Sequence, residues 1–220
     1  YLAFRWMELN GVVVNKPYFE TREWQVRNYM IPKCSPIHLR DSQHGRHMRE
    51  LGAENVPIGG HILTPLLFGG KYPSKAELET MFQEHPEYFP LIDGKRIPLD
   101  GQKYQPCTSN PEVIDIMAKS LIAKATESDS NGLIIIGNND GTGWCECENC
   151  RRLDPPEEAA RNRVATRYWT LVQTLAQRVW AVKPDAKLGG WAYQNFWAPP
   201  IGIELDPRLI VCVSFNNQCW

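Results

Sequence analysis

The 220-residue sequence has no excess of charge of either sign and no cluster of basic residues. Lys and Arg together number 24, Asp and Glu 25, and the formal net charge is −1. Surfaces that bind nucleic acids or anionic membranes are rich in Lys and Arg, so we expect no nucleic-acid partner. The sequence also lacks any run near the roughly 18 consecutive apolar residues of a membrane span, and we expect no such span.

Other absences concern the organisation of the chain. No internal repeat, low-complexity linker or Gly-x-Gly-x-x-Gly turn is present, and the missing turn disfavours a dinucleotide-binding doubly wound sheet. We expect residues 1–220 to form a single domain. The sequence begins at Tyr1 with neither an initiating Met nor a secretory signal. It is therefore expected to be a fragment of a longer protein with additional domains.

Strand-like and helix-like segments alternate along the chain. A capping box at Ser74 and Glu77 predicts one helix start, and Asn110 followed by Pro111 predicts another. Asp93-Gly94 predicts the turn of a small β-hairpin within residues 87–97. Apolar patterns predict strands at residues 3–9, 133–136, 187–193 and 209–215, and helices at 22–30, 75–85 and 157–182 as well as after Asn110.

This alternation predicts an α/β fold with right-handed crossovers and a parallel sheet. A complete β/α barrel of the TIM type needs roughly 250 residues, so the chain would supply part of one. We therefore expect a partial β/α TIM-type barrel with the small β-hairpin as an excursion from it.

The most informative segment is residues 132–150, GLIIIGNNDGTGWCECENC, where an apolar run gives way to polar residues and then to cysteines. Asn138, Asn139 and Asp140 directly follow the predicted strand. Loops at the carboxyl ends of parallel strands carry ligands and catalysis in α/β folds, which makes this loop the first candidate for function. The alternative is a solvated turn, because Asn-Asn-Asp-Gly is also favourable turn chemistry.

Acidic and aromatic residues near predicted strand ends suggest chemistry on sugars. Hydrolysis of a glycosidic bond usually needs two carboxylates, and Asp140 and Glu8 are the candidates, although Glu8 is also compatible with a surface position. Trp191 and Tyr193 lie near the end of another predicted strand. Aromatic faces suit pyranose rings, and His61 is a candidate for binding a substrate hydroxyl.

Cys145, Cys147 and Cys150 lie within six residues of one another. With a fourth ligand, for example a histidine, they would suit a structural Zn²⁺. In an oxidising compartment they would instead form disulfides. The partner would then be one of the remaining cysteines, Cys34, Cys107, Cys212 or Cys219.

Several ordered motifs together resemble the bacterial domain-of-unknown-function family 4838, found in polysaccharide-utilisation proteins. They are Gly-Gly-His at 59–61, His-Pro-Glu-Tyr-Phe-x-Leu-Ile-x-Gly-Lys-Arg at 85–96, Gln-x-Cys-x-x-Asn-Pro-Glu-Val at 105–113, and Asn-Asp-Gly followed by Cys-x-Cys-x-x-Cys. The resemblance covers residues 22–200.

The resemblance implies a glycoside-hydrolase-like β/α barrel, exported to the periplasm or the cell exterior and joined to other domains. It places Asp140 as an acid/base carboxylate. It implies a substrate pocket bordered by His61, Asn139 and Tyr193. We add Asn138 and Trp191 as substrate-binding candidates.

The leading hypothesis is a glycoside hydrolase acting on a polysaccharide or oligosaccharide, with no cofactor required for catalysis. A non-catalytic glycan-binding barrel is the first alternative, and a zinc-dependent hydrolase built on the cysteines is the second.

Overall fold

The computed structural model describes residues 29–30, 57–58, 60–99, 101–127 and 133–213. In this part of the chain a parallel five-stranded sheet has the order β1-β7-β6-β5-β2. Strand β5 pairs with β2, β6 with β5 and β7 with β6. Strand β1 pairs with β7 and so lies at the edge opposite β2. The strands are β1 (Tyr29–Met30), β2 (Pro57–Ile58), β5 (Leu133–Ile135), β6 (Leu188–Ala192) and β7 (Ile210–Val213).

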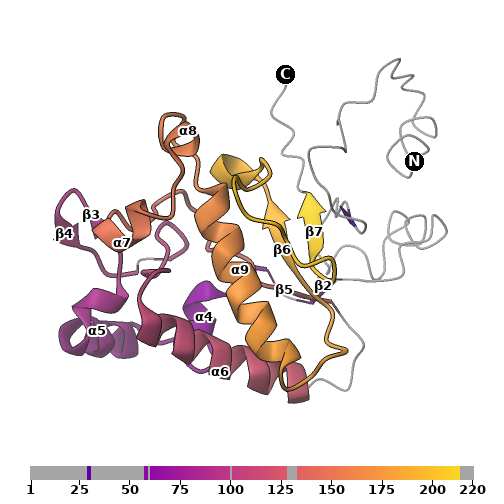
Figure 1. Ribbon diagram of the computed structural model, residues 1–220. Helices are drawn as coiled ribbons and strands as arrows, with labels where there is room; N and C mark the ends of the chain where they lie inside the picture. The colour runs from indigo at the N-terminus through magenta and orange to yellow at the C-terminus, as the bar shows by residue number, and fades with distance from the viewer. Residues whose placement is uncertain (1–28, 31–56, 59, 100, 128–132, 214–220) are drawn as a thin grey trace, which may run out of the picture.

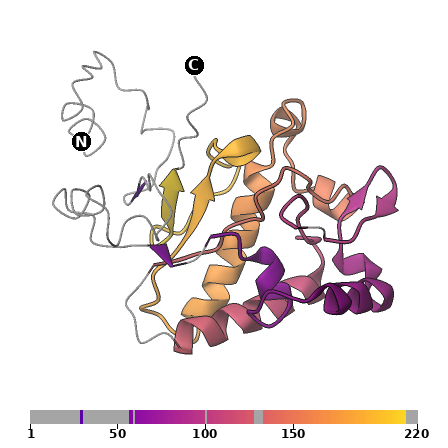
Figure 2. The same ribbon diagram turned by 180° about the vertical axis from the view of Figure 1, so that it is seen from behind.

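Six α-helices lie in the described part of the chain. Helix α9 has a buried apolar stripe and packs against β6 and α6, while α4 lies beside α6 (Figures 1 and 2). The helices are α4 (Leu63–Leu67), α5 (Lys75–Glu84), α6 (Pro111–Glu127), α7 (Glu148–Arg151), α8 (Pro156–Ala159) and α9 (Ala165–Trp180), with short 3-10 turns η2 (Pro86–Tyr88) and η3 (Gln194–Phe196). No helix in the described ranges is long and apolar enough to cross a membrane.

Strand β5 is buried on both faces, as its apolar sequence predicts. Ile134 and the following Ile136 belong to the large core that also contains the buried faces of α4, α6 and α9. Leu133 and Ile135 pack on the other face in a smaller cluster with Cys212. The polar loop that follows β5 is therefore carried by a strand held from both sides.

Tyr168 connects α9 to the ends of two strands. Its buried hydroxyl donates to the carbonyl of Ile136 (2.8 Å) and accepts the backbone N–H of Trp191 (2.8 Å). Burial raises the pKa of this phenol, which stays a hydrogen-bond donor at neutral pH. One side chain thus fixes the carboxyl ends of β5 and β6 relative to the helix that covers them.

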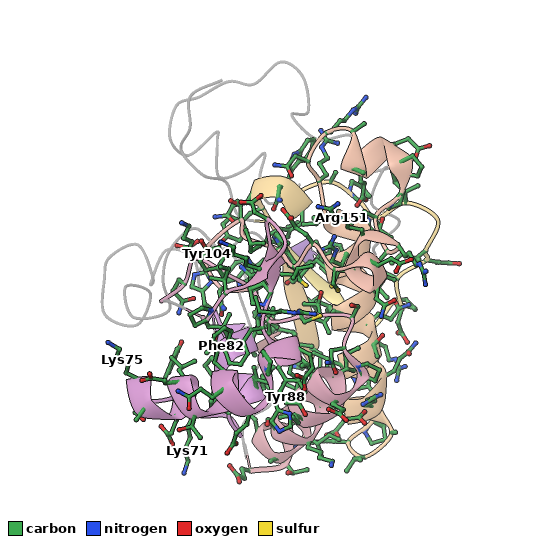
Figure 3. The ribbon with its side chains drawn as sticks, turned by 90° about the vertical axis from the view of Figure 1, so that its left-hand side faces the viewer. Lys71, Lys75, Phe82, Tyr88, Tyr104 and Arg151 are labelled. Atoms are coloured by element: carbon green, nitrogen blue, oxygen red, sulfur yellow. The ribbon has the colours of Figure 1, made fainter. Side chains whose placement is uncertain are left out.

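A small antiparallel hairpin, β3 (Leu91–Ile92) and β4 (Lys95–Arg96), lies with α5 and α7 on the side of the molecule away from the sheet (Figure 1). Its turn is the predicted Asp93-Gly94, with φ angles of 48° and 76°. Both angles are in the left-handed region that two-residue hairpin turns require. Figure 3 views this side, where Lys71 and Lys75 project outward near the start of α5.

Two predicted helix starts are confirmed by their capping interactions. The Ser74 hydroxyl accepts the N–H of Glu77 and the Glu77 carboxylate accepts the N–H of Ser74, which completes the capping box of α5. The Asn110 side chain accepts the N–H groups of Glu112 and Val113 at the start of α6.

The prediction of one helix over residues 157–182 is wrong at its beginning. The chain forms the short helix α8, adopts a left-handed conformation at Asn162 (φ 52°), and begins α9 only at Ala165. The buried carboxylate of Glu158 explains this start, because it accepts the N–H of Thr166 (2.9 Å) and its hydroxyl (2.7 Å). A continuous helix would bond the Thr166 N–H to a backbone carbonyl one turn earlier, but this carboxylate accepts it instead.

The predicted helix 22–30 is wrong at its last two residues, Tyr29–Met30, which form strand β1. The rest of that prediction, residues 22–28, and the predicted strand 3–9 lie outside the described residues. The α/β class and the parallel sheet are confirmed. A closed barrel is not formed by the described strands, since β1 and β2 lie at opposite edges of the sheet.

We predict that Gly137→Ala destabilises the protein while Gly60→Ala does not. A Cβ at Gly137 would lie 2.0 Å from the carbonyl oxygen of Gly60 and 2.7 Å from the Trp191 indole nitrogen, whereas a Cβ at Gly60 would meet no atom within 4 Å. Such overpacking against backbone typically costs about 1–3 kcal/mol. Urea unfolding of both variants measures the difference, and equal free energies of unfolding would contradict the close approach.

Candidate functional site

Three adjacent parallel strands bring the predicted polar residues to one edge of the sheet. His61 follows β2, Asn138 and Asp140 follow β5, and Tyr193 follows β6. A bridge between His61 and Gly137 continues the parallel pairing of β2 and β5 beyond the strands themselves. These side chains therefore gather at the carboxyl edge, where α/β proteins place their ligand sites.

The Asp140 carboxylate is held through one of its oxygens. Oδ1 accepts the Tyr193 hydroxyl (2.5 Å) and the Gln194 side-chain amide (3.4 Å), and it lies 3.9 Å from Nε2 of His61. The Asp140 side chain is nevertheless 56% exposed. The carboxylate is thus fixed by groups from two neighbouring strands while remaining open to a ligand.

His61 is oriented by the backbone of the Asp140 loop. Its Nδ1 lies 2.6 Å from the carbonyl oxygen of Asn138, so Nδ1 carries a proton and donates it. This leaves Nε2, on the side of Asp140, as an acceptor in the neutral ring and a donor in the charged ring. His61 can therefore exchange a proton at Nε2 without losing its anchoring hydrogen bond.

Tyr193 is a phenol rather than a phenolate in this setting. Burial raises its pKa, and the hydrogen bond to the negative carboxylate of Asp140 raises it further. It therefore keeps its proton at neutral pH and donates it to Asp140. Next to it, Gln194 has a left-handed backbone (φ 51°), which directs the chain into the turn η3.

Asn139, which the resemblance implies at the border of the substrate pocket, is held by hydrogen bonds within the protein. It is fully buried, and its side-chain amide donates to Thr64 Oγ1 (2.8 Å) and to the carbonyl of Tyr104 (2.7 Å). With both amide protons used inside the protein, the structure gives Asn139 a role in holding the loop.

Gln105 is the residue that sequence reasoning missed as part of this site. Its buried Nε2 donates to the carbonyls of Asn139 (2.9 Å) and Gly141 (2.7 Å), and its Oε1 accepts the N–H of Asn139 (2.7 Å). The carboxamide therefore binds the backbone on both sides of Asp140. The only sequence signal is its position in the Gln-x-Cys motif, which does not say what it contacts.

Three buried polar atoms without a partner belong to residues that follow β5 or lie at the end of β6. Among the described residues, the buried atoms Asn138 Oδ1, Trp191 Nε1 and Gln194 Oε1 have no hydrogen-bond partner within the protein. Asn138 is fully buried and follows the same strand as Asp140, and the Trp191 indole lies against Gly137. Buried polar groups in native proteins are almost always hydrogen-bonded, so two acceptors and one donor here indicate a polar partner beyond the described residues.

The second proposed carboxylate, Glu8, lies outside the described residues. Within the described ranges, the groups that contact the Asp140 carboxylate are a phenol, an amide and an imidazole. The described part of the site therefore supplies one carboxylate.

A second cluster brings four cysteine sulfur atoms within 4.8 Å of one another. Cys107 joins the three cysteines of the predicted motif. The fourth member is therefore a thiol and not a histidine, which was the example given from the sequence. Cys107 Sγ lies 3.7 Å from Cys147 Sγ and 3.8 Å from Cys150 Sγ. Four thiolates around one Zn²⁺ at about 2.3 Å place their sulfur atoms about 3.8 Å apart, which matches these distances.

The described cysteines form no disulfide. Cys212 is buried with Leu133 and Ile135 in the sheet, in a cluster separate from the four thiols. Of the other disulfide partners that the sequence left open, Cys34 and Cys219 lie outside the described residues. A group of four free, closely spaced thiols is thus suited to a metal ion.

Hydrogen-bond donors and one cation face these thiols. The N–H of Leu91 donates to Cys145 Sγ (3.3 Å), and Arg96 Nη1 lies 3.8 Å from the same atom. Hydrogen bonds from Cys145 and Cys150 lower the pKa of Cys107, whereas the bond to Cys107 is the main cause that raises the pKa of Cys145 to about 11. These shared hydrogen bonds favour a thiolate on Cys107 over one on Cys145.

The cysteine loop is also tied to α9. The buried guanidinium of Arg167 donates to the carbonyl of Cys145 (2.6 Å) and forms a two-pronged ion pair with Asp154. A surface pocket of about 350 Å³ reaches Cys107 and Cys147 beside the first residues of α6, so the cluster is accessible to an ion from solvent.

The fold and the carboxyl-edge site together define an α/β protein with a parallel sheet whose candidate ligand site lies on the loops after β2, β5 and β6. The chain belongs to the family described as Domain of unknown function (DUF4838), whose model matches residues 14–217. This confirms the family indicated by the motifs. No curated protein and no solved structure gives a significant match to the chain.

We predict that Asp140→Asn lowers the pKa of Tyr193 relative to the unsubstituted protein. The substitution removes the negative charge that opposes ionisation of the phenol, while its burial remains. Ultraviolet difference titration at alkaline pH, with Tyr193→Phe to identify the signal, measures the shift. An identical Tyr193 titration in both proteins would show that the two groups do not interact.

Proposed function

We propose that the protein hydrolyses a glycosidic bond in a polysaccharide or oligosaccharide, with Asp140 as one of its two carboxylates. The observation that carries the proposal is the arrangement of Asp140, Tyr193 and His61 at the carboxyl edge of the sheet, beside buried polar atoms that lack partners. Sugar hydroxyls both donate and accept hydrogen bonds, so they suit a site that offers a partly exposed imidazole and an exposed carboxylate.

The strand order supports a β/α barrel as the frame of this activity. Successive strands β2, β5, β6 and β7 are each added on the same side of the sheet, as in a barrel, and β1 pairs with β7 beyond them. The loops after these strands would then contribute to one active-site mouth. In this proposal residues 1–220 supply part of the barrel, and other domains of the polypeptide adjoin it.

Two carboxylates would divide the chemistry. One protonates the leaving oxygen, while the other attacks the sugar or activates water. Asp140 already accepts a hydrogen bond from a phenol and has its second oxygen directed to no described group. Glu8 remains our proposal for the second carboxylate, and export to the periplasm or the cell exterior remains the proposed location.

A non-catalytic glycan-binding barrel is the second candidate. It is favoured by the neighbours of Asp140 in the described residues, which are neutral donors and an imidazole rather than a second acid. Such an arrangement binds hydroxyl groups without cleaving the bond between sugars. Only a hydrolase releases cleaved sugar, so an assay for new reducing ends, made on the protein and on Asp140→Asn, distinguishes the two functions.

We also propose that the four cysteines hold a structural Zn²⁺. The sulfur spacing, the donors on Cys145 and the burial of three of the thiols support this assignment. When bound, the ion would cross-link the segment before α6 to the loop that follows Asp140. Four thiolates fill a tetrahedral zinc and leave no position for a catalytic water, which disfavours the zinc-dependent hydrolase.

We predict that Asp140→Asn in the full-length protein abolishes release of reducing sugar while oligosaccharide binding falls by no more than about tenfold. The amide keeps the shape of the carboxylate but cannot act as an acid, base or nucleophile. Reducing-end assays and calorimetric titration on a panel of polysaccharides measure the two effects. Binding without hydrolysis by the unsubstituted protein would establish the glycan-binding alternative, and unchanged hydrolysis by the variant would exclude Asp140 from catalysis.

We predict that the purified protein contains about one zinc ion per chain and that Cys107→Ser loses it. Cys212→Ala is the matched control because Cys212 is a buried cysteine outside the cluster. Elemental analysis and Co²⁺ substitution, which gives thiolate charge-transfer absorption, measure occupancy. A full zinc complement in Cys107→Ser would exclude this ligand, and loss of free thiols without metal would indicate disulfides instead.

A further inference from the structure

Tyr72 combines high exposure with a fixed position beside the candidate site. Its side chain is 68% exposed, the highest value among the large apolar side chains that the described ranges expose. Its hydroxyl donates to the backbone carbonyl of His61 (3.1 Å). Because His61 contacts both the carbonyl of Asn138 and the Asp140 carboxylate, the ring lies one residue away from the proposed reaction centre.

The ring of Tyr72 follows a glycine turn and is anchored through its hydroxyl. Gly69 and Gly70 have φ angles of 68° and 89°, which let the chain turn after α4 and lead to Tyr72, and the hydroxyl is anchored at the far end of the ring. An aromatic ring with its position already set loses little conformational freedom when a ligand binds to it. Exposing such a ring costs hydrophobic free energy that burial in the core would have recovered, so it is suited to contact a ligand.

We propose that Tyr72 is a stacking platform for a second sugar unit, and that the site therefore binds an oligosaccharide chain in preference to a single sugar. This inference rests on the proposed carbohydrate function. The exposed Asp140 carboxylate and the partly exposed His61 imidazole would bind the hydroxyls of one sugar, while the Tyr72 ring would receive the apolar C–H face of its neighbour. The bound chain would run from the loop after β6, across Asp140, toward the segment that follows α4.

Two substitutions of Tyr72 separate stacking on a sugar from a purely structural role. Tyr72→Phe keeps the ring face and removes only the hydrogen bond to His61, whereas Tyr72→Ala removes both. Val182→Ala serves as a control, because Val182 is another exposed apolar side chain (58%), located just after α9.

The experiment compares binding of oligosaccharides with binding of their component monosaccharides, by calorimetry on the full-length protein and its variants. We expect Tyr72→Ala to weaken oligosaccharide binding about tenfold, a loss of the size that an aromatic contact provides. Monosaccharide affinity should not change, and Tyr72→Phe should retain most of the oligosaccharide affinity. Val182→Ala should match the unsubstituted protein.

Two outcomes would overturn the inference, and they differ in what they say about the site. If the unsubstituted protein prefers oligosaccharides and Tyr72→Ala keeps that preference, the platform is excluded and the carbohydrate function stands. If the unsubstituted protein neither binds nor hydrolyses any saccharide of the panel, the proposed function itself fails and the platform fails with it.

Discussion

The buried carboxamide of Gln105 is the contact on which the candidate site most depends. It satisfies backbone groups of Asn139 and Gly141 in a region without regular strands or helices, where an isolated bridge between Tyr104 and Gly143 also pairs this loop with the Gln105 segment. Hydrogen bonds shielded from water are strong, and leaving any of these groups unpaired would be costly. A flexible-looking Asn-Asn-Asp-Gly stretch is thereby made into a fixed support for an exposed carboxylate.

The same short segment serves the cysteine cluster. Gln105 holds the loop before Cys145, and Cys107, two residues later, joins the thiols that come after it. Arg167 from α9 then binds the carbonyl of Cys145. The loop from Gly137 to Cys150 is thus held at its start, in its middle and at its end by different parts of the chain, which explains how a stretch with little secondary structure can position reactive groups.

The elements that the sequence predicted well are those with local signals. The capping box at Ser74, the Asn110 cap, the Asp93-Gly94 turn and the apolar run of β5 depend on neighbouring residues, and the structure contains all of them. The contacts that it could not predict join distant positions. Gln105 lies 34 residues from Asn139, Cys107 lies 40 residues from Cys147, and the break before α9 depends on the buried pairing of Glu158 with Thr166. The spacing of these residues in the sequence does not predict such pairings.

The position of Cys107 has a consequence for how the chain folds. Helix α6 and strand β5 both lie between Cys107 and the other three cysteines. Any bond that unites the four thiols therefore closes a loop containing one central strand and the helix that leads to it, and it reduces the freedom of the unfolded chain in that region. In the folded structure the four thiols meet with α6 docked and β5 paired in the sheet, so a bond among them holds this half of the domain closed.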